Sequence, residues 1–238
     1  MTPLVLVHGF MGASAQWAPQ REALGARFDL IAVDLPGFGE NANLRAIDRI
    51  GDFADWILQH LSQMGVGNFH LLGHSMGGMI VQEMVSRAPE RIKKLVLYGT
   101  GPSGNLPGRF ETIEESKRRA ATDGPRQTAR RISATWFLNN ADDPSYETCA
   151  ALAEKSSAGA IAAGLDAMSH FDATDRLGAI AAPTLILWGD HDRTYSWAQT
   201  EQLWNGIAGA NLAVVPGCAH AVHLEKPALF NDLVLDFL

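Results

Sequence analysis

The residues best suited to chemistry lie in one short stretch, Gly73-His74-Ser75-Met76-Gly77. An apolar run at residues 69–72 predicts a buried strand before it, and residues 76–87 predict a helix after it. A Gly-x-Ser-x-Gly pattern in this context is typical of a nucleophile elbow, a sharp turn that presents the serine hydroxyl at a helix N-terminus. A serine between glycines is more often a simple turn, but the flanking strand and helix favour the catalytic interpretation. We therefore predict that Ser75 is a nucleophile.

A serine nucleophile needs a base and a carboxylate, and both residue types follow expected strands late in the chain. The base takes the serine proton, and the carboxylate fixes the tautomer of the base. Asp190 and Asp192 follow one expected strand, and His220 and His223 follow the last one. The carboxyl ends of parallel strands meet at one edge of a sheet, where these residues can approach Ser75. His220 is favoured because only a glycine-containing loop separates it from its strand, while His223 and Asp190 remain rivals.

A third group of candidates stabilises negative charge. His8-Gly9-Phe10 directly follows an expected strand at residues 4–7, where hydrolases of this layout place half of an oxyanion hole. We predict that the backbone N–H groups of Phe10 and Met76 point at one developing oxyanion, because two fixed donors stabilise it without reorganisation. A glycine turn that needs a positive φ is the simpler alternative, and both can hold together.

Alternating strands and helices are expected to position these groups. The strand-like segments are residues 4–7, 30–33, 69–72, 95–98, 184–188 and 213–215. The helix-like segments between and after them are residues 17–24, 47–64, 76–87, 197–206 and 227–238. Such alternation predicts an α/β fold, a parallel sheet covered by helices on both faces.

Residues 99–182 interrupt the alternation. A glycine- and proline-rich loop at 99–108 precedes helical segments, and these are expected at residues 114–121, 125–137, 146–156 and 158–171. We expect residues 101–182 to form a helical cap over the C-terminal edge of the sheet, inserted into a core made of residues 1–100 and 183–238. The charge clusters within residues 111–119 are expected to be solvated helix faces.

Composition excludes several classes of function. The chain has 238 residues and a net charge of −7, so no basic field attracts nucleic acid or an anionic membrane surface. Cys149 and Cys218 lie far apart, which argues against a disulfide framework, and no metal-ligand spacing occurs. The N-terminus lacks the features of a signal peptide, and no run is long enough to span a membrane. The expected location is the cytoplasm, and no metal or organic cofactor is implied.

Together these motifs resemble those of the α/β-hydrolase superfamily over nearly the whole chain. The matching pieces are His8-Gly9-Phe10, Asp34-Leu35-Pro36-Gly37-Phe38-Gly39, Gly73-His74-Ser75-Met76-Gly77-Gly78, Gly189-x-x-Asp192 and His220-x4-Glu225-x-Pro227. The resemblance selects Asp192 over Asp190 as the acid, and His220 as the base. Since only seven residues precede His8, the resemblance implies an α/β-hydrolase fold whose mostly parallel sheet lacks the first hairpin and keeps about six strands.

Within the superfamily the chain looks like small bacterial esterases, 3-oxoadipate enol-lactonases and hydrolases of meta-cleavage products. This resemblance implies a carboxylic ester hydrolase that cleaves a small-molecule ester or lactone through a Ser-His-Asp triad and an acyl-enzyme. Apolar side chains between sheet and cap are the candidate substrate-binding residues, although each is more often simply core: Met11, Trp136, Phe137, Met168 and Phe171.

Two alternatives stay open. The first is hydrolysis of a carbon–carbon bond in a meta-cleavage type dienoate, which uses the same triad. The second is a hydrolase-fold receptor that binds a ligand with little turnover, and this alternative also has a complete triad.

Overall fold

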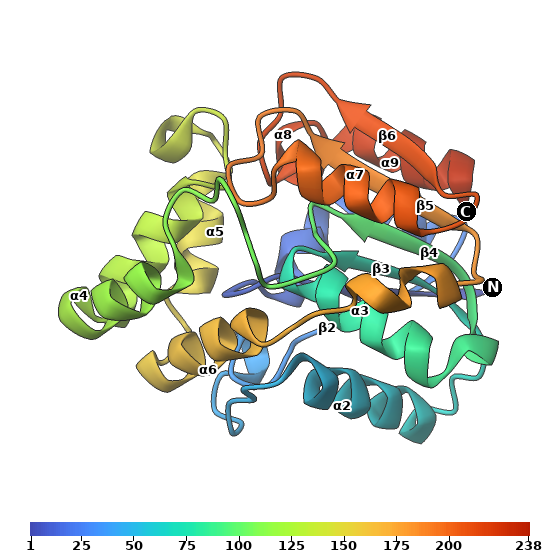
Figure 1. Ribbon diagram of the computed structural model, residues 1–238, viewed down its shortest axis with the longest axis horizontal. Coiled ribbons are helices and arrows are strands. Elements are labelled where there is room, and N and C mark those ends of the chain that lie inside the picture. The colour runs from blue at the N-terminus through green and yellow to red at the C-terminus, as the bar shows by residue number, and fades with distance from the viewer.

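Six parallel strands form the centre of the molecule, and the computed structural model describes all residues, 1–238 (Figure 1). The strands are β1 (Pro3–Val7), β2 (Asp29–Val33), β3 (Phe69–His74), β4 (Ile92–Tyr98), β5 (Thr184–Gly189) and β6 (Asn211–Val215). Their order across the sheet is β2-β1-β3-β4-β5-β6, and every neighbouring pair is parallel. The predicted fold class and strand number are confirmed.

Helices cover both faces of this sheet, because alternate strand residues point in opposite directions. The α-helices are α1 (Arg21–Gly25), α2 (Ile50–Gln63), α3 (Met76–Arg87), α4 (Ile113–Ala134), α5 (Tyr146–Ala153), α6 (Ala158–Ser169), α7 (Trp197–Gly206), α8 (Val222–Glu225) and α9 (Pro227–Phe237). In β1, Val5 and Val7 pack into one buried cluster with α2 and α3, whereas Leu4 and Leu6 pack into another with α1 and α9. None of these helices combines the length and apolar character needed to cross a membrane.

Two helical segments differ from the prediction. The helix expected at 17–24 is a 3-10 helix, η1 (Ser14–Gln20), followed by the short α1, and Pro19 lacks the N–H that a regular α-helix needs there. The four-residue α8 is too short to produce a hydrophobic period, so the sequence did not predict it. By contrast, the two helices expected at 114–121 and 125–137 are both present: they share the label α4 but meet at a kink at Gly124, where φ is 79° and ψ is 168°.

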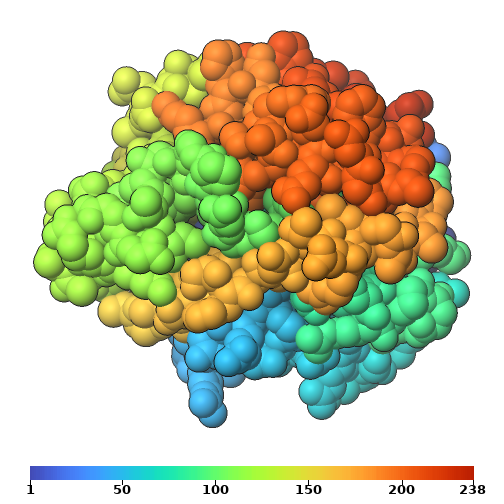
Figure 2. All heavy atoms as spheres, viewed as in Figure 1, coloured from blue at the N-terminus to red at the C-terminus, as the bar shows by residue number.

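Between β4 and β5 the chain forms α4, α5 and α6, which lie beyond the carboxyl ends of the strands (Figure 1). This segment contains no named strand, only an isolated bridge between Ser103 and Asp172. Figure 2 shows the chain around α4, in green, packed against the C-terminal segment, in orange and red. The backbone N–H of Phe110 donates to the carbonyl of Arg193 (2.9 Å) across this junction.

The contacts from the C-terminal segment to the end of α4 use backbone atoms of the helical segment. The N–H of Ala221 donates to the carbonyl of Trp136 (2.9 Å). The guanidinium of Arg193 donates to the carbonyl of Phe137, and the N–H of Leu138 donates to a carboxylate oxygen of Glu225 at 2.7 Å. The two segments are therefore joined through main-chain groups of the helical segment.

The expectation of solvated charge clusters is wrong for Glu111. Its side chain is only 10% exposed, and its carboxylate is 2.7 Å from Arg131 and 3.5 Å from Arg119. Because α4 is kinked at Gly124, Arg131 from its second half and Arg119 from its first half both reach Glu111.

Candidate active site

Ser75 occupies the turn between β3 and α3 in a strained conformation, with φ 58° and ψ −122°. The turn is tight: a Cβ atom at Gly73 would overlap the carbonyl of Gly77, and one at Gly77 would overlap the carbonyl of Val7. A backbone hydrogen bond holds the serine in place, because the N–H of Ser75 donates to the backbone carbonyl of Tyr98 (3.0 Å). The need for glycine on both sides therefore follows from the close approach of α3 to β1 and β3.

Asp192 and His220 meet at the same edge of the sheet. Nδ1 of His220 lies 2.7 Å from Oδ2 of Asp192, and both side chains are almost fully buried. The other carboxylate oxygen accepts the N–H groups of Thr194 (2.7 Å) and Tyr195 (3.0 Å), which fix its orientation. Since an ionised carboxylate can only accept, Nδ1 carries the proton and Nε2 is left free to act as a base. No hydrogen bond joins His220 and Ser75 in this structure.

The rival residues lie elsewhere. The Asp190 carboxylate accepts the N–H of Cys218 at 3.4 Å and does not contact His220. His223 is buried against the phenol of Tyr98, with Nδ1 3.1 Å from the hydroxyl. Burial, and secondarily the charge of His220, lowers the pKa of His223 to about 3. The structure thus brings Asp192 together with His220 and leaves Asp190 and His223 outside this pair.

The backbone carbonyl of His220 is held by two side chains that the sequence did not single out. Nε2 of His74 lies 3.0 Å from this carbonyl oxygen, and the Tyr98 hydroxyl donates to it at 2.9 Å. The rings of His74 and Tyr98 stack at 4.4 Å between centroids. Burial lowers the pKa of His74 well below its ordinary value, and it raises the pKa of Tyr98. Both groups are therefore neutral donors that position the loop of His220.

Two backbone N–H groups near Ser75 are free of protein acceptors. Those of Phe10 and Met76 donate to no protein atom, and Met76 is the first residue of α3, where helical N–H groups have no partner in the helix. His8 orders the loop before Phe10, because its Nδ1 donates to Gly9 (2.8 Å) and its Nε2 accepts from Leu35 (3.1 Å). Burial lowers the pKa of His8 to about 4, so this neutral form persists well below pH 7.

A small cavity of about 20 Å³ reaches the Ser75 side chain, which is room for roughly one water molecule. Its lining residues are Phe10, Ser75, Arg109, Phe110, Ile132, Trp136, Met168 and Thr194. Two of the five expected substrate-binding residues, Trp136 and Met168, are among them. Met11 and Phe137 are fully buried in the main core and do not line the cavity.

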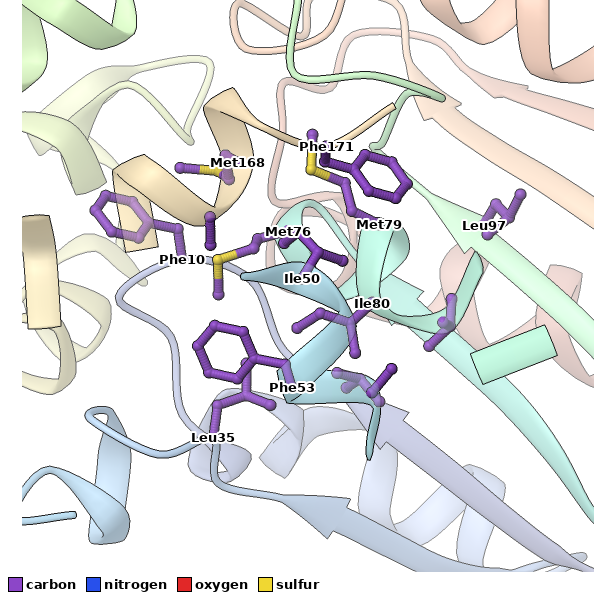
Figure 3. Close-up of a cluster of buried hydrophobic side chains, with 14 of the residues drawn as sticks. Phe10, Leu35, Ile50, Phe53, Met76, Met79, Ile80, Leu97, Met168 and Phe171 are labelled. Atoms are coloured by element: carbon purple, nitrogen blue, oxygen red, sulfur yellow. The ribbon is translucent and has the colours of Figure 1, made fainter. Parts of the chain in front are cut away.

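Phe171 also does not line this cavity. It belongs to the buried cluster of α2 and α3, where Figure 3 shows its ring beside Met79, whereas Phe10 and Met168 lie together closer to Met76. Hydrophobicity placed these side chains in the interior, but it did not distinguish the core from the cavity wall. The polar lining residues Arg109 and Thr194 gave no signal in the sequence, because an arginine in a glycine- and proline-rich loop is typical of a solvated surface.

Comparison with known proteins agrees with this architecture. A sequence model of the alpha/beta hydrolase fold matches residues 2–227, so the chain belongs to this family. The predicted resemblance to the superfamily is confirmed, and the chain is a hydrolase of this class.

Relatives in the family carry different names. A protein of Variovorax paradoxus, provisionally named carbamate hydrolase RutD, is 30% identical over 99% of this chain and 91% of its own. The 2-hydroxy-6-oxononadienedioate/2-hydroxy-6-oxononatrienedioate hydrolase of Klebsiella pneumoniae is also 30% identical, over 99% of this chain and 86% of its own. A malate-bound thermophilic esterase from Thermogutta terrifontis superposes with a TM-score of 0.88 at 26% identity, covering 99% of this chain and 89% of that one.

Proposed function

We propose that the protein is a serine hydrolase that cleaves a small carboxylic ester or lactone through Ser75, His220 and Asp192. The observation that carries this proposal is the buried 2.7 Å hydrogen bond between Asp192 and His220 at the sheet edge that also holds the strained Ser75. Residues 101–182 act in this proposal as the cap that encloses the substrate.

The proposed reaction has two halves. Nε2 of His220 takes the Ser75 proton while Oγ attacks the substrate carbonyl, and the N–H groups of Phe10 and Met76 hold the oxyanion. His220 then gives its proton to the leaving oxygen as the carbon–oxygen bond breaks, leaving an acyl-serine. In the second half His220 takes a proton from water, which attacks the acyl carbon. The bond from that carbon to Oγ then breaks, His220 returns the proton to Oγ of Ser75, and the acid is released. Asp192 stabilises the imidazolium formed in each half.

A p-nitrophenyl ester series tests the proposal directly. We expect Ser75→Ala to lower kcat by roughly 10³-fold or more, and Asp192→Asn by about 10³-fold, because both remove members of one catalytic unit. The control is Ser86→Ala, since Ser86 lies on α3 and its hydroxyl only contacts the carbonyl of Gln82. A fluorophosphonate should label the wild type at Ser75. Equal ester hydrolysis by wild type and Ser75→Ala, with no labelling, would refute the proposal.

A second candidate is carbon–carbon bond hydrolysis with the same residues, and the Klebsiella relative at 30% identity favours it. The assay is the loss of colour of a chromogenic dienoate, which ester cleavage does not produce. A carbamate should be included, because the relative from Variovorax is named for that activity. The substrate with the largest kcat/KM identifies the reaction class.

A further inference from the structure

Three hydrogen-bonding groups around the Ser75 cavity have no partner in the protein. Nε of Arg109, Oγ1 of Thr194 and the hydroxyl of Tyr195 are all buried and unbonded. Arg109 and Thr194 line the cavity with Ser75. The Tyr195 ring stacks on the His220 ring at 5.8 Å between centroids. Its hydroxyl does not line the cavity but lies close to the side chains of Ser75 and Thr100, and no contact of full hydrogen-bond geometry satisfies it. Native proteins leave few buried polar groups unpaired, so two that line one cavity, with a third beside Ser75, indicate a ligand that supplies acceptors.

Arg109 also brings a positive charge that no carboxylate neutralises. Its Nη1 donates to the backbone carbonyl of Glu111 (2.6 Å) and to Ser116 (3.0 Å), and its guanidinium lies 4.2 Å from the centroid of the Phe110 ring. The nearby Glu111 carboxylate instead binds Arg131 at 2.7 Å. Burial is the main cause that lowers the pKa of Arg109, which reflects the cost of enclosing a charge without a counter-ion.

The position of Arg109 places this charge between two cavities, one of which reaches Ser75. It lines the 20 Å³ cavity at Ser75 and also a second cavity of about 310 Å³ on its other side, formed largely by the loop before α4 and the first turn of that helix. No other residue lines both. An anion bound to the guanidinium therefore lies a short distance from the Ser75 hydroxyl.

We propose that Arg109, with the hydroxyls of Thr194 and Tyr195, binds a carboxylate of the substrate, so that the protein acts on small esters or lactones that carry a free acid. This inference rests on the proposed function of Ser75. The guanidinium fork matches the two oxygens of a carboxylate, and the hydroxyls can donate to the same group. The planar carboxylate needs less room beside so small a cavity than a tetrahedral phosphate.

The test compares two matched esters. One is mono-p-nitrophenyl glutarate, which carries a free acid, and the other is p-nitrophenyl methyl glutarate, in which that acid is masked. We expect the wild type to prefer the acid by roughly 10- to 100-fold in kcat/KM, the range for a charge-assisted hydrogen bond. Arg109→Gln should reduce this ratio to about one, and Arg109→Lys should keep part of it. Arg118→Gln removes an exposed arginine that pairs with Glu115 and should keep the wild-type ratio.

Binding of glutarate provides a readout that does not need turnover. We expect glutarate to raise the Tm of the wild type and of Ser75→Ala, and not that of Arg109→Gln. Inorganic phosphate at the same ionic strength is the second ligand, and a larger shift with phosphate than with glutarate would overturn the choice of a carboxylate.

The possible failures are separable. If Arg109→Gln lowers the rates for both esters by the same factor, together with Tm, then Arg109 only anchors its loop and the carboxylate site is refuted while the serine hydrolase stands. If the wild type cleaves neither ester and resists the fluorophosphonate, the proposed function fails. In that case glutarate binding is the remaining test of the carboxylate site. If glutarate does not raise the Tm of the wild type, the carboxylate site is refuted as well.

Discussion

Tyr98→Phe is the substitution with the best-defined consequence, because the Tyr98 hydroxyl uses its full hydrogen-bonding capacity. A phenol has one proton and two lone pairs. The proton goes to the His220 carbonyl at 2.9 Å, and the lone pairs accept the N–H of His223 at 3.2 Å and its Nδ1 at 3.1 Å. The substitution therefore removes three buried hydrogen bonds and leaves two donors of His223 without an acceptor.

The magnitude follows from these three bonds. Each contributes about 1 kcal/mol, and an orphaned buried donor costs about 1–3 kcal/mol, so we expect Tyr98→Phe to lower the free energy of unfolding by about 3–5 kcal/mol. The other two tyrosines are internal controls. Tyr146 makes one long bond, 3.3 Å to the carbonyl of Arg130, so its loss should cost about 1 kcal/mol or less. The Tyr195 hydroxyl has no partner, and Tyr195→Phe should be neutral or slightly stabilising without ligand.

Urea denaturation of the wild type and the three Tyr→Phe variants measures this order. A circular dichroism spectrum and the denaturant slope m establish that each variant unfolds from the same native state. A cost for Tyr98→Phe no larger than that for Tyr146→Phe would refute the argument, because it would mean that the hydroxyl does not hold the His220 loop. If Tyr98→Phe also loses ester hydrolysis at a temperature at which it is still folded, the result would indicate that the His220 loop must be held in place for catalysis.

Two further predictions concern the elbow and the buried histidines. Gly77→Ala should lower the free energy of unfolding by about 3 kcal/mol or more, because its Cβ would overlap the backbone of Val7 and His8, which cannot rotate away. The control is Gly178→Ala, which has open space around it and should lower the same free energy by less than about 0.5 kcal/mol in the same denaturation assay. Equal losses in the two variants would contradict the steric argument. His8 and His223 have pKa values of about 4 and about 3 in the folded protein, against 6.5 when unfolded. Below pH 6.5 the unfolded chain therefore binds protons that the folded chain does not, so the free energy of unfolding should fall as the pH drops from 6.5 toward 4. Urea denaturation at a series of pH values measures this change. A free energy of unfolding that stays constant over this range would refute the buried neutral state of His8 and His223.

The sequence carried more information on the backbone of the site than on its pocket. Ser75, Asp192 and His220 each follow a strand, so local patterns and the geometry of a parallel sheet were enough to expect them at one edge. The loop of Phe10 was found in the same way. The choice of Asp192 over Asp190, and of His220 as the base, also needed the resemblance to the α/β-hydrolase superfamily.

The pocket depends on packing between segments that are far apart in the chain. Met11 and Phe171 are apolar and buried, but which space they face is decided by how the helices between β4 and β5 dock, and no local period encodes that. Arg109 and Tyr98 were missed for the same reason. Their roles come from partners such as Ser116 and His220, which become neighbours only in the folded chain.

The way α4 is attached to the C-terminal segment has an evolutionary consequence. Ala221 and Arg193 donate to the carbonyls of Trp136 and Phe137, and Glu225 accepts the N–H of Leu138. These bonds use main-chain groups: the carbonyls are present in every amino acid and the N–H in all but proline. Exposed side chains of residues 101–182 can therefore change while these bonds remain, whereas buried ones such as Phe137 and Leu165 also pack in the main core. Under the proposed function, in which residues 101–182 form the cap over Ser75, the cap can change its substrate preference independently of the strands that precede Ser75, Asp192 and His220. Chimaeras that exchange this segment between relatives should then still react with a fluorophosphonate at the serine.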